Sequence, residues 1–174
     1  MINKEFFNRN PDIVAKELLG KIIVRKVDGK KLIAKIVETE AYFDEKDPAS
    51  RARQNGDLRK TMEMDAGTLL VYGVHSNWLL NFITNNIGIA SAVLIRAIEP
   101  LNFDERGDGP GLLTKSLKVG KELHKKHIED NELWIENDSN NKFEIVKSFR
   151  IGVSNDLEEP MRFYIKDNKH ISRK

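Results

Sequence analysis

Residues 32–42, L-I-A-K-I-V-E-T-E-A-Y, begin with the apolar and polar alternation of a half-buried β-strand and end in two acids and an aromatic ring. Side chains two residues apart share a face of a strand, so Glu38, Glu40 and Tyr42 lie on one side and extend an apolar stripe. A carboxylate at the end of a buried apolar stripe is costly to desolvate unless a cation or a water lies against it. The alternative is that both acids lie at a solvated strand end.

Turn residues and periodicity predict the other elements. Asn10-Pro11-Asp12 is typical of a helix start, and Gly20 of a helix end. Asp28-Gly29 predicts a hairpin between strands at 21–27 and 32–42. Further strands are predicted over residues 69–75, 78–84, 92–100, 134–135, 144–149 and 162–165, and helices over about 112–117 and 121–130.

The segment 92–100, A-V-L-I-R-A-I-E-P, is apolar on both faces, which predicts a central strand of a sheet. Arg96 lies in the middle of this segment. A buried arginine must be paired, and a carboxylate at a neighbouring strand end is the natural partner. We expect Glu40 to be that partner, in an ion pair that serves either structure alone or chemistry.

Residues 43–66 have no apolar periodicity and predict a long loop. Within this loop, a stretch of ten residues contains four cations: Arg51, Arg53, Arg59 and Lys60. They form either a solvated surface or a phosphate-binding one, and arginine favours the second because its fork matches phosphate oxygens. The R-G-D-G-P-G turn at 106–111 lacks the ending of a nucleotide-binding P-loop, although the helix after it could hold one phosphate.

Composition narrows the class of protein. A chain of 174 residues, 40% hydrophobic and 32% charged, predicts one globular domain over residues 1–174. There are no cysteines, which excludes disulfides and thiolate chemistry, and no apolar run reaches the roughly 18 residues of a membrane span. The start of the chain does not resemble a signal peptide, so a cytoplasmic location is expected. A net charge of +2 permits a polyanionic partner without requiring one. His124 and His127 lack a third ligand, and no metal is expected.

Six blocks of sequence together resemble the alkyladenine (3-methyladenine) DNA glycosylases. They lie in the family's order and cover nearly the whole chain. They are V-A-K-E-L-L-G-K (14–21, after Phe6-Phe7), I-V-E-T-E-A-Y (36–42), A-G-T-L-L-V-Y (66–72), A-V-L-I-R-A-I-E-P (92–100), G-P-G-L-L-T-K (109–115), and R-I-G-V (150–153) with P-M-R-F-Y (160–164). The resemblance implies an α+β fold in a single domain, with a mostly antiparallel, curved, barrel-like sheet and surrounding helices.

The same resemblance implies an enzyme that flips a damaged purine, hypoxanthine or an alkylated adenine or guanine, out of duplex DNA. Water then cleaves the N-glycosidic bond and leaves an abasic site. By position, Glu40 matches the family's general base, while Arg96 and the main-chain carbonyl of Ile151 match the groups that hold the attacking water. No lysine matches a Schiff-base position, which implies a monofunctional enzyme without a cofactor or metal.

The resemblance also implies a pocket for the flipped base. Tyr42 and Tyr72 match the aromatic residues that sandwich the base, and Asn81 matches the asparagine that discriminates against the amino group of guanine. Arg51 lies where family members usually have a histidine on the pocket wall. Because a positive charge disfavours bases that are already cationic, this departure predicts a preference for neutral lesions such as hypoxanthine.

The partner implied is duplex DNA with a damaged purine, bound by a monomer that associates with the nucleoid through DNA. The V-H-S-N-W segment departs from the family's pattern, so the resemblance does not assign one residue to fill the gap in the duplex. We expect His75 in this role, with Asn77 or Trp78 as alternatives. The remaining DNA contacts are expected from Arg53, Arg59 and Lys60.

Two other functions compete with this hypothesis. A relative that binds damaged or duplex DNA without catalysis would share the fold, but it would not need Glu40 and Arg96 together. A folate-linked formyl-transfer relative would need its own Asn, His and Asp constellation, which has no place in this sequence.

Overall fold

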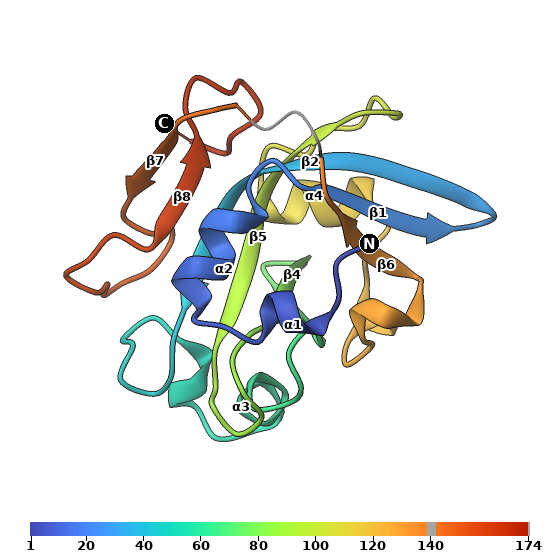
Figure 1. Cartoon of the computed structure of the whole chain (residues 1–174). Helices are drawn as coiled ribbons and strands as arrows, with labels where there is room; N and C mark the ends of the chain where they lie inside the picture. Colours follow the sequence, from blue (N-terminus) through green and yellow to red (C-terminus); the bar gives the residue numbers. More distant parts are fainter. Residues whose placement is uncertain (139–141, 174) are drawn as a thin grey trace.

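The computed structural model describes residues 1–138 and 142–173 (Figure 1). Its helices are α1 (Lys4–Phe7), α2 (Pro11–Leu18), α3 (Asp57–Met62) and α4 (Pro110–Ser116), with 3-10 turns η1 (Arg51–Arg53), η2 (Lys121–Leu123) and η3 (Ile128–Asp130). Its strands are β1 (Ile22–Val27), β2 (Lys30–Tyr42), β3 (Leu69–Val74), β4 (Asn77–Ile83), β5 (Ala92–Pro100), β6 (Leu133–Glu136), β7 (Ile145–Ser148) and β8 (Arg162–Ile165). The predicted strands are thus present, with ends that agree within two residues.

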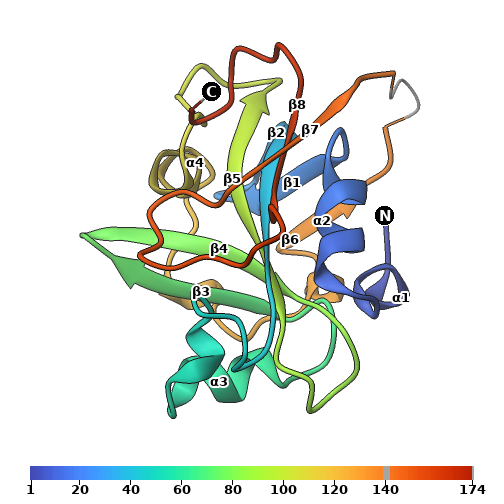
Figure 2. The ribbon, with the colours of Figure 1, turned by 90° about the vertical axis from the view of Figure 1, so that its left-hand side faces the viewer.

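The strands form one antiparallel sheet in the order β3-β4-β5-β2-β1-β6, with β8 paired to β2 and β7 to β8. Strand β2 pairs with β5 along one edge. Along its other edge it pairs first with β1, over Lys30–Lys35, and then with β8, over Glu38–Glu40. Because β2 changes partner halfway, the sheet curls around this strand (Figures 1 and 2). The predicted α+β fold with a curved antiparallel sheet is confirmed.

Two of the helices pack against the curled sheet. Helix α2 contacts β2 and β5, and α4 contacts β4 and β5. Most buried apolar side chains form one cluster, which includes the fully buried rings of Phe7, Phe82 and Phe163. A smaller cluster around Met62 and Leu70 lies under α3. No helix of the described part of the chain is long and apolar enough to cross a membrane.

The helix predicted over residues 121–130 is wrong. In its place are the separate 3-10 turns η2 and η3, because the backbone between them bonds to the start of β3. Leu69 donates to Lys126 O (2.8 Å), and Lys125 donates back to Leu69 O (2.9 Å). The ring of His124 accepts from Val71 N (3.2 Å) and contacts Asp57, so it is used to hold β3 and α3 together.

The loop predicted over residues 43–66 contains two short helical elements, η1 and α3. Leu58 and Met62 are one helical turn apart and pack on the smaller apolar cluster, a spacing that could have predicted α3. Asp57 places an acid in the first turn of α3 and is paired with Lys125. This segment forms one wall of the cavity described below.

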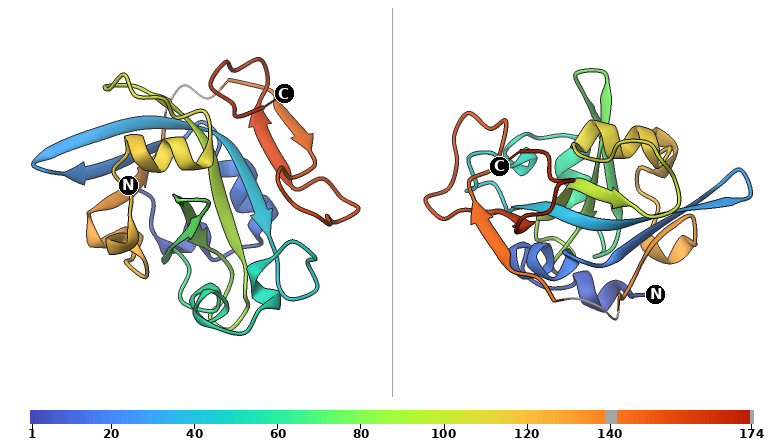
Figure 3. Two further views of the ribbon diagram at one scale, coloured as in Figure 1. Left: turned by 180° about the vertical axis from the view of Figure 1, so that it is seen from behind. Right: turned by 90° about the horizontal axis from the view of Figure 1, so that it is seen from above.

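The β3–β4 hairpin leaves the body of the molecule in a different direction from the β1–β2 hairpin (Figures 2 and 3). His75 and Ser76 form its two-residue turn, with φ angles of 47° and 62°. Paired positive φ values are the geometry that suits a tight hairpin, although they strain residues other than glycine. His75 is exposed at this tip of the hairpin.

Candidate active site

The two acids of the E-T-E-A-Y motif are fully buried, each with 0% of its surface exposed. The solvated strand end is therefore excluded. Arg96 of β5 lies against both of them, with Nε 3.3 Å from Glu38 Oε1 and Nη1 3.4 Å from Glu40 Oε1. The expected pairing of Arg96 with Glu40 is present, and Glu38 shares the same guanidinium.

A distortion of the sheet accompanies this arrangement. Glu38 pairs with Ala97, whereas Thr39 pairs with Ile95, so the register of β2 against β5 is irregular where Arg96 lies. Such irregularities re-aim side chains within a strand pair. On the other edge of β2, Glu38 and Glu40 are also paired with β8. The acid–arginine group therefore sits where three strands meet.

Glu40 receives two hydrogen bonds besides the contact with Arg96. The backbone N–H of Ile151 donates to Oε1 (2.8 Å), and the Tyr42 hydroxyl donates to Oε2 (2.7 Å). Burial raises the pKa of Glu40 above its ordinary value, although Arg96 and these two donors oppose the rise. A carboxylate offers about four acceptor positions, which leaves capacity for one further donor such as water. The main-chain carbonyl of Ile151 as a water ligand stays a prediction.

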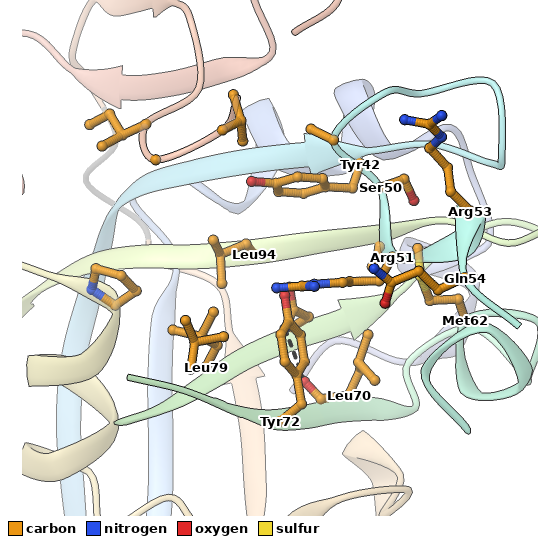
Figure 4. Close-up of a pocket in the computed structure, with 18 of the residues that line it drawn as sticks. Tyr42, Ser50, Arg51, Arg53, Gln54, Met62, Leu70, Tyr72, Leu79 and Leu94 are labelled. Atoms are coloured by element: carbon orange, nitrogen blue, oxygen red, sulfur yellow. Dashed lines mark hydrogen bonds between the residues drawn. The ribbon is translucent and has the colours of Figure 1, made fainter. Parts of the chain in front are cut away.

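A cavity of about 740 Å³ lies directly beside this group. Figure 4 shows Tyr42 and Tyr72 entering it from opposite walls, one from β2 and the other from β3. Asn81 is 3% exposed in its wall, and its amide donates to Leu70 O (3.1 Å). The cavity is lined by every residue predicted for the base pocket, Tyr42, Arg51, Tyr72 and Asn81, together with Arg96 and Ile151.

Arg51 of η1 reaches into the same cavity. Its guanidinium carbon lies 5.5 Å from the centre of the Tyr72 ring, and in Figure 4 the side chain extends across the space between the two tyrosines. Burial raises the pKa of Tyr72, and the nearby Arg51 opposes this rise. The guanidinium of Arg51 thus places a permanent positive charge between the two aromatic walls.

The sequence reasoning missed Arg150, which supports Tyr42 from behind. Its guanidinium carbon lies 4.6 Å from the centre of the Tyr42 ring. Its two terminal nitrogens donate to the carboxylate of Asp47 (2.7 Å each), and one of them also donates to Ala41 O (3.0 Å). Asp156 accepts from Nε (2.7 Å). Arg150 lies in the R-I-G-V block, but nothing local in the sequence marks the distant Asp47 as its partner.

Two of the residues expected to contact DNA, His75 and Arg53, line the cavity. His75 is exposed at the hairpin tip and lines the cavity. Asn77 directly follows the turn, packs against Gly111 and donates to His75 O (3.0 Å), so its side chain is engaged within the protein. Arg53 also lines the cavity and donates to Pro48 O (3.1 Å). Arg59 is engaged with three acceptors inside the protein, Ala52 O, Glu63 and Glu45.

In residues 1–138 and 142–173, no group of three or more His, Asp or Glu side chains is arranged to hold a metal ion. His127 contacts Ala66 O (2.9 Å), so both histidines of this region have structural partners.

Comparison of the sequence with known proteins identifies a family and several relatives. A family model described as "Methylpurine-DNA glycosylase (MPG)" matches residues 5–169. Proteins named "Putative 3-methyladenine DNA glycosylase" are similar over their full length. The protein of Aeropyrum pernix is 39% identical, covering 99% of this chain and 93% of its own. That of Legionella pneumophila (strain Corby) is 40% identical (98% and 97%), and that of Clostridium beijerinckii is 37% identical (100% of both).

These matches show the class of this protein, which is an N-glycosylase of base excision repair. The chain belongs to the methylpurine-DNA glycosylase family, whose members remove alkylated purines from DNA. The resemblance drawn from the sequence motifs is confirmed.

Proposed function

We propose that this protein flips a damaged purine from duplex DNA into the cavity and hydrolyses its N-glycosidic bond with water activated by Glu40. The observation that carries the proposal is the buried Glu40, held by Arg96 and Ile151 beside a cavity with two aromatic walls. Glycosidic cleavage passes through a sugar that resembles an oxocarbenium ion. A carboxylate at this place both stabilises the positive charge and deprotonates water.

The attacking water would reach the carboxylate from the cavity. Glu40 has no exposed surface in the DNA-free protein, but Arg96 and Ile151 contact it and also line the cavity. We propose that entry of the lesion opens a position for water between these three residues. The guanidinium and the main-chain carbonyl would then fix its orientation, which lowers the barrier because little freedom is lost in the reaction.

Stacking offsets the cost of extruding the base. Flipping costs a few kcal/mol and least for a damaged or mispaired base, while each base–aromatic stack contributes about 1–3 kcal/mol. Tyr42 and Tyr72 enter from opposite walls as such a sandwich requires, and Asn81 lies between their strands. In this proposal His75, which is exposed at the hairpin tip, would fill the gap in the duplex, and Arg53, Arg59 and Lys60 would contact phosphates. The protein would act as a monomer. It would associate with the nucleoid by binding DNA.

The lesion preference is expected to depend on Arg51. Two unit charges about 5 Å apart repel by about 3 kcal/mol at an effective dielectric constant near 20, and solvent reduces this value. We therefore expect release of neutral hypoxanthine to exceed release of cationic 7-methylguanine, and Arg51→His to shift that ratio about tenfold toward 7-methylguanine. Single-turnover rates on the two duplexes measure the ratio.

The matched control is Arg53→His, which makes the same exchange at the cavity mouth. It is expected to weaken binding of both duplexes alike and leave the ratio of rates unchanged. Faster release of 7-methylguanine than of hypoxanthine by the unmodified protein would contradict the role of Arg51.

Base release should decline on acidification, because only the ionised form of Glu40 can accept a proton. Burial raises the pKa of Glu40 above the ordinary 4.5, so the rate is full above this raised pKa and is lost as the pH falls through it. Single-turnover rates across the acidic range, with DNA binding measured at each pH, locate the midpoint. A midpoint below 4.5 would show that Glu40 is not the base.

One experiment separates catalysis from mere binding. The protein is incubated with a duplex that carries one hypoxanthine or one 3-methyladenine, and the DNA is then treated with alkali. Strand breaks at the lesion show an abasic product and support the proposal. A gel shift without strand breaks on any lesion would instead support a DNA-binding relative that has lost catalysis.

A further inference from the structure

Behind the cavity wall lies a second buried carboxylate, that of Glu38. We propose that Glu38 and Ser172 are positioning residues that hold Arg96 in the orientation in which it can serve Glu40. The inference rests on the proposed function and deepens it. Neither Glu38 nor Ser172 lines the cavity, so both would act through Arg96.

Glu38 is saturated with donors. Oε1 accepts from Arg162 Nε (2.7 Å) and from the Ser172 hydroxyl (2.8 Å), and Oε2 accepts from the backbone N–H of Ser172 (2.6 Å). Arg96 Nε lies 3.3 Å from the same Oε1. A carboxylate held by so many donors is a fixed anchor for the Nε edge of Arg96, and the Nη1 side is left to face Glu40.

Ser172 closes this network from a segment far away in the sequence. Its hydroxyl accepts from Arg96 Nε (3.4 Å) while donating to Glu38, so it touches both partners of the ion pair. Arg162 binds the carbonyl of Arg173 as well as Glu38, and Ile171 is 9% exposed and packs into the core. The segment 171–173 is thus fastened directly behind the acid–arginine group.

The charges in this region are balanced between two acids and two arginines. Arg96 divides its attraction between Glu38 and Glu40, whereas Arg162 serves Glu38. Glu38 also acts on Glu40 as a like charge that raises its pKa. The charged and titratable groups around Glu40 are Arg96 of β5, Glu38 and Tyr42 of β2, Arg162 of β8, Arg150 behind Tyr42, and Arg51 and Tyr72 across the cavity.

This division predicts opposite effects for two substitutions. Ser172→Ala removes a donor from Glu38, which then draws Arg96 toward itself and away from Glu40. The acidic limb of the pH profile is the range in which the rate of base release falls as Glu40 is protonated. It should move to higher pH by about 0.5 to 1 unit, because a weaker interaction with Arg96 raises the pKa of Glu40. Glu38→Gln removes the like charge that raises the pKa of Glu40, together with the anionic anchor of the Nε edge of Arg96. The acidic limb should then move to lower pH by a similar amount.

The experiment measures single-turnover base release against pH for the wild type, Ser172→Ala, Ser172→Thr and Glu38→Gln, on the lesion that the wild type releases fastest. DNA affinity and melting temperature are recorded for each variant. Ser172→Thr keeps the hydroxyl and is expected to restore the wild-type limb. Because Glu38→Gln leaves two buried arginines with one acid fewer, it is the variant at risk of unfolding, and Ser172→Ala tests the inference without it.

The outcomes are distinguishable. Opposite displacements of the limb, with rescue by threonine, support the positioning role. A loss of melting temperature and rate in Ser172→Ala with the limb unmoved would show a structural role only and overturn the inference. A wild type that releases no base from any lesion would overturn the proposed function itself.

Discussion

Glu40→Gln is expected to lower the single-turnover rate of base release by a factor of 10² or more, while binding of the lesion duplex stays within about threefold. A positioned general base typically contributes 10²–10⁴ in rate. Glutamine keeps the size of the side chain: its one oxygen can still accept from the Ile151 N–H, and its amide NH2 can donate to the Tyr42 hydroxyl oxygen instead of accepting from it. It cannot accept a proton from water at neutral pH, so the loss should appear in the chemical step.

The control for this variant is Glu5→Gln, the same exchange at an exposed position on α1 far from the cavity. It should leave both the rate and the affinity unchanged. A Glu40→Gln protein that releases base at more than about one tenth of the wild-type rate would remove Glu40 from the role of base.

Arg150→Met is expected to lower the free energy of unfolding by about 3–5 kcal/mol, the usual cost of breaking a buried ion pair by removing one partner. The side chains of Arg150 and Asp47 are both 0% exposed, and methionine would leave the Asp47 carboxylate buried without its cation. Denaturant unfolding measures the change, provided that the slope of the transition is unaltered. Base release should fall too, since the Tyr42 ring loses its support.

Lys166→Met provides the matched comparison. Lys166 pairs with Glu144 at 2.8 Å, but both side chains are about half exposed or more. Exposed pairs contribute about 0–1 kcal/mol, so this change should be small. A loss of less than about 1 kcal/mol in Arg150→Met would show that the buried network does not stabilise this part of the fold.

The sequence predicted the strands well because their signals are local. Alternation along 32–42 and the apolar run of 92–100 each depend on a few neighbouring residues, and the Asp28-Gly29 turn fixes the first hairpin. The pairing of Glu40 with Arg96 could also be anticipated, because a cation buried in a central strand requires an acid nearby. These elements carry the fold and the centre of the candidate site.

The remaining features depend on contacts between distant residues. The sequence predicts a helix over residues 121–130. The backbone groups of residues 125–128 instead form hydrogen bonds with residues at and just before the start of β3. Asp47 and Arg150 are separated by 103 residues, and Ser172 reaches Glu38 across 134. No local pattern records such pairs, so the support of Tyr42 and the anchoring of Arg96 emerge only from the structure. Motif resemblance supplied the roles of Tyr42, Tyr72 and Asn81, which spacing alone would not give.

The most direct measurement is a crystal structure of the Glu40→Gln variant bound to a duplex with one hypoxanthine. We expect the base between the rings of Tyr42 and Tyr72, and an ordered water within about 3 Å of the Ile151 carbonyl and of the side chain at position 40, on the side that faces the sugar. A hypoxanthine that remains stacked in the duplex, or a water site remote from position 40 and Arg96, would contradict hydrolysis by a water that Glu40 activates.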